Sequence, residues 1–542
     1  MKAATALRRA APGLERSIAR ALHSELRAFW RRRPVDPGLV LFESFDGNGA
    51  LCNPEALFRA LIADPAFSAL TFVWSLRAGH DGDIVLRDFR GDPRVRFVRP
   101  GSSGYERAVA TAGHLVTNAT FPRWFSRRPG QVVVNTWHGT PLKKMGFDIG
   151  DQPARVANVL RNFLHADYLL STGPYMTSTM YLGAHALDGL YDGRILEVGS
   201  PRVDAQFAGQ DSTGRTLEAL HAAGIDPEHR QLVLFAPTWK GTNFSRPLDD
   251  ARLVLSQTRE LQTRLGDAYR VVLKAHQAVH ESVRGRVESG LLVPNDIPTN
   301  AVLAVTDQLV TDYSSIFFDF LTTGRPIHFL VPDIGDYDGY RGLYLQPDTW
   351  PGRVTTTVEE LAASILSAPD PVADERAQEA RATFAPLEDG HATERVLDEV
   401  FRNPRPVSPV SPRDPSAKPR VVVLAGGPPT SWAPAQTDAA VASIDLGAVD
   451  VTVVVSDSRR APFVAWQKSL DPRIRVLVRQ GEIGGSKSWA LLERLGARRP
   501  AAHWSAEWTR LFGLSRIDEV RCASDDPFWR RLARAGSSPA RT

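Results

Sequence analysis

The stretch VVVNTWHGTPLKK, residues 132–144, decides how this sequence is interpreted. Its β-branched run indicates a buried strand, and the Gly-Thr-Pro that follows ends the strand in a loop carrying His138. A second run, VVLKAH at 271–276, ends in the same way at His276. Imidazoles titrate near neutral pH. If the two loops meet, as loops at the carboxyl ends of parallel strands do, they form a cleft lined by two histidines.

Strand-like and helix-like segments alternate on both sides of this stretch. We expect strands at 39–42, 71–74, 95–98, 114–117 and 132–134, a helix at 54–62, and further strands at 232–235, 271–273, 291–293, 308–311 and 327–330. Such alternation is typical of parallel sheets covered by helices. The sequence therefore predicts an α/β protein with two Rossmann-like domains, residues 37–205 and 206–401, facing a cleft.

Three further regions flank these domains. Residues 1–36 are predicted to form a basic amphipathic helix, because apolar residues recur near helical spacing and residues 1–33 hold nine Lys or Arg against two Glu. Such a helix suits an anionic membrane surface, and a solvated or domain-packing helix is the alternative. Residues 402–419 hold six prolines, which predict a semi-rigid linker. Residues 420–542 are expected to form a small α/β segment of unknown role.

The bulk composition excludes several classes of protein. With 542 residues, 43% apolar residues and a net charge of +4, the chain is expected to be globular and to hold two or three domains. Cys52 and Cys522 provide neither a disulfide framework nor metal-ligand spacing. The sequence shows no apolar run of transmembrane length, no P-loop and no Gly-x-Ser-x-Gly elbow. We therefore expect no metal and no cofactor.

Polar and cationic residues gather at the predicted strand ends. Gly139 lets a backbone approach a ligand closely, and Lys143 adds positive charge for a phosphate. The loop after 232–235 offers the Thr238 hydroxyl and the Lys240 cation. Lys274 lies two residues before His276, so both side chains share one face if the strand continues.

A helix start after the strand at 308–311 is a further candidate. Ser314 and Ser315, which follow Asp312, are predicted to cap a helix from Ile316, and helix starts of this kind hold phosphate. Arg341, in a glycine-containing loop, suits bidentate phosphate contact. Structural roles stay open at each position: a buried histidine donating to a carbonyl, solvated lysines, ordinary caps or a salt bridge. Together the candidates predict an enzyme acting on a phosphorylated substrate.

The ordered succession of these motifs resembles a known family. Residues 137–143, 236–239, 273–276, 311–319, 331–333 and 340–344 follow one another as in the CDP-glycerol glycerophosphotransferases of teichoic acid synthesis. The segments 42–45, 53–54 and 389–395 resemble that family's opening and closing segments. The similarity covers about residues 39–400. Gln277 stands where the family usually has proline after the second histidine.

The resemblance implies a GT-B fold and the transfer of glycerol phosphate from CDP-glycerol, with release of CMP, to a lipid-linked teichoic-acid-like polymer. The family's two catalytic histidines correspond to His138 and His276. The first domain is then the acceptor side and the second binds the CDP-polyol. We expect the substrate to be bound by Gly139, Lys143, Thr238, Lys240, Lys274, Asp312, Ser314, Ser315 and Arg341, with no nucleic acid as partner. The implied location is the cytoplasmic face of the membrane, with residues 1–33 on the anionic surface.

The mechanistic hypothesis is attack of the polymer's terminal hydroxyl on the β-phosphorus of the donor. His138 is the proposed general base, while His276, Lys274, Arg341 and the Ser314–Ser315 helix start stabilise the diphosphate. The sequence does not decide which of the two histidines is the base and which stabilises the phosphate. The rival interpretations are a GT-B glycosyltransferase using a nucleotide sugar, a CDP-ribitol ribitolphosphotransferase, and a catalytically silent membrane scaffold.

Overall fold

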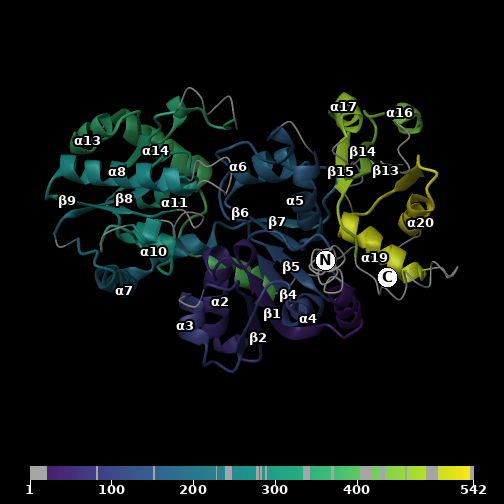
Figure 1. Cartoon of the computed structure of the whole chain (residues 1–542), viewed down its shortest axis with the longest axis horizontal. Helices are drawn as coiled ribbons and strands as arrows, with labels where there is room; N and C mark the ends of the chain where they lie inside the picture. Colours follow the sequence, from purple (N-terminus) through teal and green to yellow (C-terminus); the bar gives the residue numbers. More distant parts are fainter. Residues whose placement is uncertain are drawn as a thin grey trace, which may run out of the picture.

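The computed structural model describes residues 21–80, 83–149, 153–227, 229–238, 247–275, 280, 283–286, 290–333, 342–367, 371–402, 418–427, 434–457, 460–483 and 499–537. Within these residues three separate parallel sheets lie side by side, and each is covered by helices (Figure 1). The sheet of the first predicted domain lies between the other two.

The central sheet has seven strands in the order β3-β2-β1-β4-β5-β6-β7, and all neighbours are parallel. Strands buried on both faces read as continuous apolar runs, which explains why the sequence revealed most of them. The strands are β1 (Asp36–Glu43), β2 (Thr71–Ser75), β3 (Val95–Val98), β4 (Ala112–Thr117), β5 (Val132–Asn135), β6 (Tyr168–Ser171) and β7 (Arg194–Glu197).

Helices cover both faces of this sheet. Apolar residues of α2 (Cys52–Ala63) and α3 (Ile84–Phe89) pack on one face, and those of α4 (Ser103–Thr111) and α5 (Pro153–His165) pack on the other. Aromatic rings dominate the first face, where Phe58 of α2 meets Phe72 and Trp74 of β2 edge to face at 5.3 and 5.6 Å. The arrangement is the Rossmann-like first domain that the alternation predicts.

The second sheet has five parallel strands in the order β12-β11-β10-β8-β9. The strands are β8 (Gln231–Ala236), β9 (Tyr269–Leu273), β10 (Gln308–Thr311), β11 (Ile327–Leu330) and β12 (Arg353–Thr355). Its helices are α7 (Gly209–Ala222), α8 (Pro247–Leu265), α10 (Thr299–Val305), α11 (Ile316–Phe320), α13 (Val358–Leu366) and α14 (Pro371–Phe384). The strand expected at 291–293 is wrong: only Leu292 pairs, as an isolated bridge to Leu273, because Pro294 follows at once and lacks a donor.

After the second sheet the chain returns to the first domain. The segment formed by α15 (Ala392–Leu397) and the π-helix Asp398–Arg402 places Val396 and Val400 in the hydrophobic core beside β1. The Arg395 guanidinium donates to the Val198 carbonyl at 3.0 and 2.9 Å. The two domains are therefore joined by two crossings of the chain.

The C-terminal region forms a third sheet of four parallel strands in the order β15-β14-β13-β16. The strands are β13 (Arg420–Gly426), β14 (Asp450–Ser456), β15 (Arg475–Arg479) and β16 (Glu519–Cys522), with helices α16 (Pro434–Ala442), α17 (Ala461–Ser469), α19 (Ala501–Phe512) and α20 (Pro527–Gly536). Leu511 and Phe512 of α19 share one core with Leu160 and Phe163 of α5. This C-terminal domain is thus docked on the first domain by an apolar interface. Residues 403–417 of the predicted linker lie outside the described residues.

The described part of the basic N-terminal segment is helical over residues 21–30. One side of it packs on the first domain: Arg27 pairs with Glu106 at 3.1 Å, and Arg31 donates to the Ser126 carbonyl at 2.7 Å. The domain-packing alternative therefore applies to this side of the helix. Residues 1–20 lie outside the described residues. No helix within the described ranges has the length and apolar character that crossing a bilayer requires.

Candidate active site

The loop that carries His138 is held rigidly at the carboxyl end of β5. The Asn135 side chain accepts a hydrogen bond from the Trp137 N–H at 3.0 Å. Asn53 donates to the carbonyls of Thr136 and Trp137 at 3.2 and 3.3 Å. These bonds hold Trp137 at a φ of 47°, a left-handed conformation that is strained for a bulky residue and recurs at functional sites.

The hydrogen bond of His138 fixes which ring nitrogen is basic. Its Nδ1 lies 2.6 Å from the Asn118 carbonyl oxygen. A carbonyl only accepts, so Nδ1 carries the hydrogen and Nε2 of the neutral ring holds the lone pair. The ring stacks on Trp137 at 4.4 Å and meets Phe45 edge-on at 5.5 Å. The histidine does donate to a carbonyl, as in the structural alternative, but its side chain is exposed and not buried.

Asn118 orients the site through both its backbone and its side chain. Its Oδ1 accepts from the Phe45 N–H at 2.8 Å, while its carbonyl holds His138. Phe45 has a φ of 49°, so it is held in the left-handed region where it contacts the imidazole. Asn118, just after β4, thus holds both the His138 ring and the Phe45 residue that packs against it.

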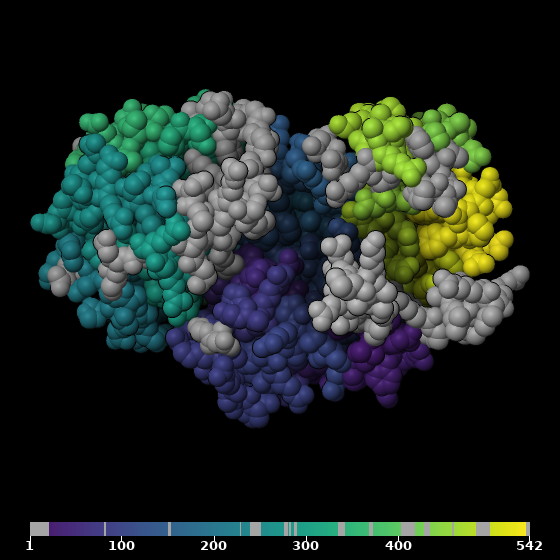
Figure 2. Space-filling view, in the orientation of Figure 1, coloured from purple at the N-terminus to yellow at the C-terminus, as the bar shows by residue number. Residues whose placement is uncertain are grey.

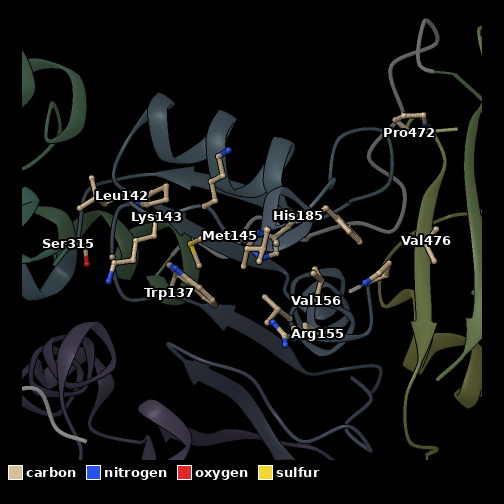
Figure 3. A pocket seen from close by; sticks show the side chains of 18 of the residues that line it. Trp137, Leu142, Lys143, Met145, Arg155, Val156, His185, Ser315, Pro472 and Val476 are labelled. Atoms are coloured by element: carbon tan, nitrogen blue, oxygen red, sulfur yellow. The ribbon is translucent and has the colours of Figure 1, made fainter. Parts of the chain in front are cut away.

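Both Rossmann-like domains contribute to the site around His138. A Cβ atom added to Gly139 would lie 2.9 Å from the Ser315 hydroxyl, so glycine allows the close approach of the two domains. A cavity of about 820 Å³ is lined by His138, Gly139 and Lys143 from the first domain and by Thr238, Ser314 and Ser315 from the second. Figure 3 shows Ser315 and Lys143 at one end of this cavity. The structure therefore brings six of the predicted site residues together.

A short backbone pairing strengthens this junction. Lys143 forms an antiparallel bridge with Leu343, and the Tyr344 N–H donates to the Leu142 carbonyl at 2.9 Å. The Tyr344 hydroxyl donates to Asp148 at 2.6 Å and accepts from the Met145 N–H at 3.2 Å. Residues 142–148 of the first domain are thus tied to residues 342–344 of the second.

Two of the predicted substrate contacts have structural partners. Asp312 Oδ1 accepts from both the N–H and the hydroxyl of Thr238 at 2.7 Å, which fixes the loop after β8. Lys274 is buried, and its ammonium donates to the carbonyls of Pro294 and Ile297 at 2.9 and 3.2 Å. Burial lowers the pKa of Lys274 to about 8. Substrate contact by Asp312 and Lys274 stays a prediction.

The serine pair differs from the predicted helix cap. Ser315 occupies the N-cap position of α11 but has helical torsions, φ −71° and ψ 0°, and its side chain makes no capping bond. A side chain caps well only from an extended N-cap residue, which explains the difference. The Ser314 hydroxyl instead accepts from the Ile316 N–H at 3.4 Å. Because α11 has only five residues, the hydroxyls rather than a helix dipole are what this segment offers a phosphate.

Lys240, His276 and Arg341 lie outside the described residues, so their roles stay predictions. Among the described residues, no group of three or more His, Cys, Asp or Glu side chains is placed to hold a metal ion.

Asp319 of α11 faces the first domain. It forms a bidentate pair with Arg202 of the first domain, with N–O distances of 2.7 and 2.8 Å. The Arg202 N–H in turn donates to Asn53 Oδ1 at 3.1 Å, and Asn53 holds the Trp137 carbonyl. A buried ion pair therefore connects the second domain to the His138 loop. Nothing local in the sequence marks Arg202 for this role.

His185 is a further histidine of the cavity that the sequence did not single out. Its Nδ1 lies 2.8 Å from the Met180 carbonyl, and its ring packs edge-on against Phe163 at 5.0 Å. Burial lowers the pKa of His185 to about 4, so the ring is neutral near pH 7. It follows no strand, so the pattern that revealed His138 gives no signal here.

Comparisons with known proteins identify the family of this chain. The family model of CDP-glycerol:poly(glycerophosphate) glycerophosphotransferases matches residues 25–402. The chain is 30% identical over 390 residues to a teichoic acid poly(glycerol phosphate) polymerase of Bacillus subtilis strain 168, covering 68% of this chain and 50% of the relative. It is 29% identical over 381 residues to the polymerase of the same name from Bacillus spizizenii, covering 68% of this chain and 93% of that relative. The chain thus spans half the length of the first relative and most of the second.

Solved structures give the same result for the fold. The wall teichoic acid polymerase TagF superposes with a TM-score of 0.60 at 24% identity, covering 73% of this chain and 97% of TagF. A variant of TagF soaked with CDPG gives the same score. This likeness confirms the predicted GT-B-like arrangement of two Rossmann-like domains.

Proposed function

The chain belongs to the family of CDP-glycerol:poly(glycerophosphate) glycerophosphotransferases, and from this premise we propose that it transfers glycerol phosphate from CDP-glycerol to a teichoic-acid-like polymer. The observation that carries the proposal is the cavity between the two domains. It combines a histidine whose Nε2 is the basic nitrogen with a lysine and three hydroxyls. These groups suit a hydroxyl nucleophile and a phosphate electrophile.

In the proposed reaction the acceptor's terminal hydroxyl oxygen forms a bond to the β-phosphorus of CDP-glycerol. The bond from this phosphorus to the oxygen bridging the two phosphates breaks, and CMP leaves with that oxygen. The hydroxyl proton passes to Nε2 of His138, and the hydrogen bond from Nδ1 to the Asn118 carbonyl supports the imidazolium that forms.

The remaining residues are proposed to bind and neutralise the donor. Lys143, Ser314 and Ser315 face the shared cavity and offer an ammonium and two hydroxyls to the diphosphate. Thr238, held by Asp312, lines the same cavity. We assign His276, Lys274, Lys240 and Arg341 to the leaving phosphate, His276 because of the family resemblance and the other three because of their positive charge.

A donor panel tests this function. Purified protein is incubated with a glycerol phosphate acceptor and with CDP-glycerol, CDP-ribitol or a UDP-sugar, and nucleotide release and acceptor extension are measured together. We expect CMP release and acceptor extension with CDP-glycerol. Preference for CDP-ribitol would change the donor but keep the chemistry, whereas transfer only from the UDP-sugar, or no transfer, would refute the proposal.

We further propose that the acceptor is lipid-linked and that residues 1–33 bind the cytoplasmic face of an anionic membrane. The helix at residues 21–30 turns Leu22 and Phe29 outward on one face, where they are 59% and 42% exposed. The Arg33 guanidinium lies 4.5 Å from the Phe29 ring centroid. Exposed apolar side chains beside arginines are what an interfacial helix presents to anionic lipid.

Vesicle binding tests the membrane contact. Leu22→Asp and Phe29→Asp together are expected to weaken cosedimentation with phosphatidylglycerol vesicles at least tenfold, because they remove two apolar groups and add two negative charges. Leu366→Asp, at a site 54% exposed on the second domain, is the matched control and should change nothing. Equal vesicle binding by wild type and the double variant would exclude this surface.

A further inference from the structure

The cavity at His138 continues well beyond the two family domains. Its far wall is formed by residues 464–476 of the C-terminal domain, including Val464 of α17 and Val476 of β15. Figure 3 shows Pro472 and Val476 at the opposite end of the cavity from Ser315, with Arg155 and Val156 of α5 between them. Figure 2 shows this face of the molecule hollowed between the first and C-terminal domains.

The chemistry of the lining changes from one end to the other. Around His138 it carries the polar groups of Lys143, Thr238 and the serine pair, beside apolar residues such as Leu142 and Met145. Toward the C-terminal domain it is mostly apolar, with Val156 and Val159 of α5 facing Val464, Leu470, Ile474 and Val476. Arg155 and Lys468 add positive charge beside this apolar part, and the Asp471 carboxylate, which also lines it, is paired with Arg473 at 2.7 Å.

Such a gradient selects an amphiphile. Phosphate groups are favoured at the lysine end. Several phosphates buried against valine and isoleucine would lose their hydration and gain no hydrogen bonds in exchange. An alkyl or isoprenoid chain there gains the free energy of apolar burial instead. The positive charges at Arg155 and Lys468 suit a phosphate at the junction between head and tail.

The apolar wall is built into the fold and does not depend on a ligand to form. Arg475 donates to the carbonyls of Ala186 and Asp188 at 2.6 and 2.5 Å, and Gln480 donates to the Ala154 carbonyl at 2.8 Å. These bonds fix β15 against the first domain. The wall lies beyond residue 402, where the family match ends, so it is a feature of this chain's own C-terminal region.

We infer that the C-terminal domain forms the binding groove for the apolar tail of the acceptor, directing its phosphate head to His138. This inference rests on the proposed transfer to a lipid-linked acceptor and adds the place on this chain where the apolar tail of the acceptor binds. The groove end defined by Val464, Leu470, Ile474 and Val476 is the tail site.

Alkyl esters of glycerol phosphate of increasing length test the inference. For the wild type, kcat/KM should rise from the ethyl through the hexyl to the decyl ester, by about fourfold for each methylene that enters the groove. Val464→Asp places a carboxylate in the groove and Val464→Trp fills it. Both should abolish the gain with chain length while the ethyl ester reacts as with the wild type. Ala465→Asp, on the same helix but exposed and outside the cavity lining, is the matched control and should retain the gain.

Calorimetric binding of the decyl ester separates this inference from the proposed function. If no ester is extended but the decyl ester binds wild type more than tenfold tighter than Val464→Asp, the transfer reaction is refuted and the groove stands. If the ethyl ester is extended but chain length changes neither kcat/KM nor the dissociation constant, the groove is refuted and the transfer stands. Retention of the chain-length gain in both Val464 variants would also overturn the inference.

Discussion

The ion pair between Arg202 and Asp319 should hold the second domain against the His138 loop. Both side chains are about nine-tenths buried, at 11% and 10% exposure, and two hydrogen bonds of 2.7 and 2.8 Å join them. Asn300 donates a third bond to Asp319 at 3.1 Å. Replacing Arg202 by methionine leaves a buried carboxylate with one amide donor, and breaking buried pairs in this way costs about 3–5 kcal/mol.

Hydrogen exchange measures this cost without assuming that a multidomain chain unfolds in one step. In Arg202→Met, peptides containing Asn53 and Asn300 should lose protection by about a hundredfold or more, the equivalent of about 3 kcal/mol. Combining it with Asp319→Leu removes the orphaned charge, so protection in the double variant should partly recover. Transfer activity should fall in Arg202→Met, because Asn53 links the Arg202 backbone to the Trp137 carbonyl.

An exposed ion pair provides the control. Arg264 and Glu260 of α8 lie 2.9 Å apart but are 38% and 48% exposed, so Arg264→Met should change local exchange less than about threefold. The reasoning is refuted if Arg202→Met leaves the Asn53 and Asn300 peptides as protected as in wild type. It is also refuted if the double variant loses as much protection as the two single changes added together.

Two further perturbations follow from the site geometry. Gly139→Ala should lower kcat/KM at least tenfold, because its methyl group would lie 2.9 Å from the Ser315 hydroxyl. Adding Ser315→Gly to this variant should restore part of the lost activity. An unchanged kcat/KM in Gly139→Ala would contradict the close approach of the two domains. Burial lowers the pKa of Lys274 to about 8 from its ordinary 10.5. Between these pH values the unfolded chain therefore binds more protons than the folded chain. The free energy of unfolding should then rise with pH across this window, by up to about 3 kcal/mol. Lys274→Met should remove this rise in thermal midpoints measured at about pH 7.5 and 10.5, and a parallel rise in both proteins would argue against the buried ammonium.

The sequence predicts the two Rossmann-like domains well because their central strands are buried on both faces. Continuous apolar runs such as those of β5 and β8 are visible without any tertiary information. The missed strands β6, β7, β12 and β16 are only three or four residues long, and β7, β12 and β16 lie at sheet edges and carry charged residues. Short segments of this composition cannot be told from loops by periodicity.

The site was predictable as far as it lies in strand-end loops. The patterns around His138, Gly139 and Ser315 led to residues that share one cavity. Contacts between distant elements left no such pattern. The Asn118 carbonyl that sets the His138 tautomer, the Arg202–Asp319 pair and the C-terminal wall all depend on how domains pack. The spacing of Lys274 predicts a phosphate ligand, but the two bonds from its ammonium to backbone carbonyls could not be predicted from the sequence.

The central claim is that Nε2 of His138 accepts the proton of the attacking hydroxyl. Single-turnover transfer from CDP-glycerol by His138→Ala, compared with wild type, tests it most directly. We expect a fall of roughly 10²–10⁴-fold with unchanged circular dichroism and unchanged donor binding, the size of a lost general base. Transfer at the wild-type rate by a folded His138→Ala protein would contradict the account.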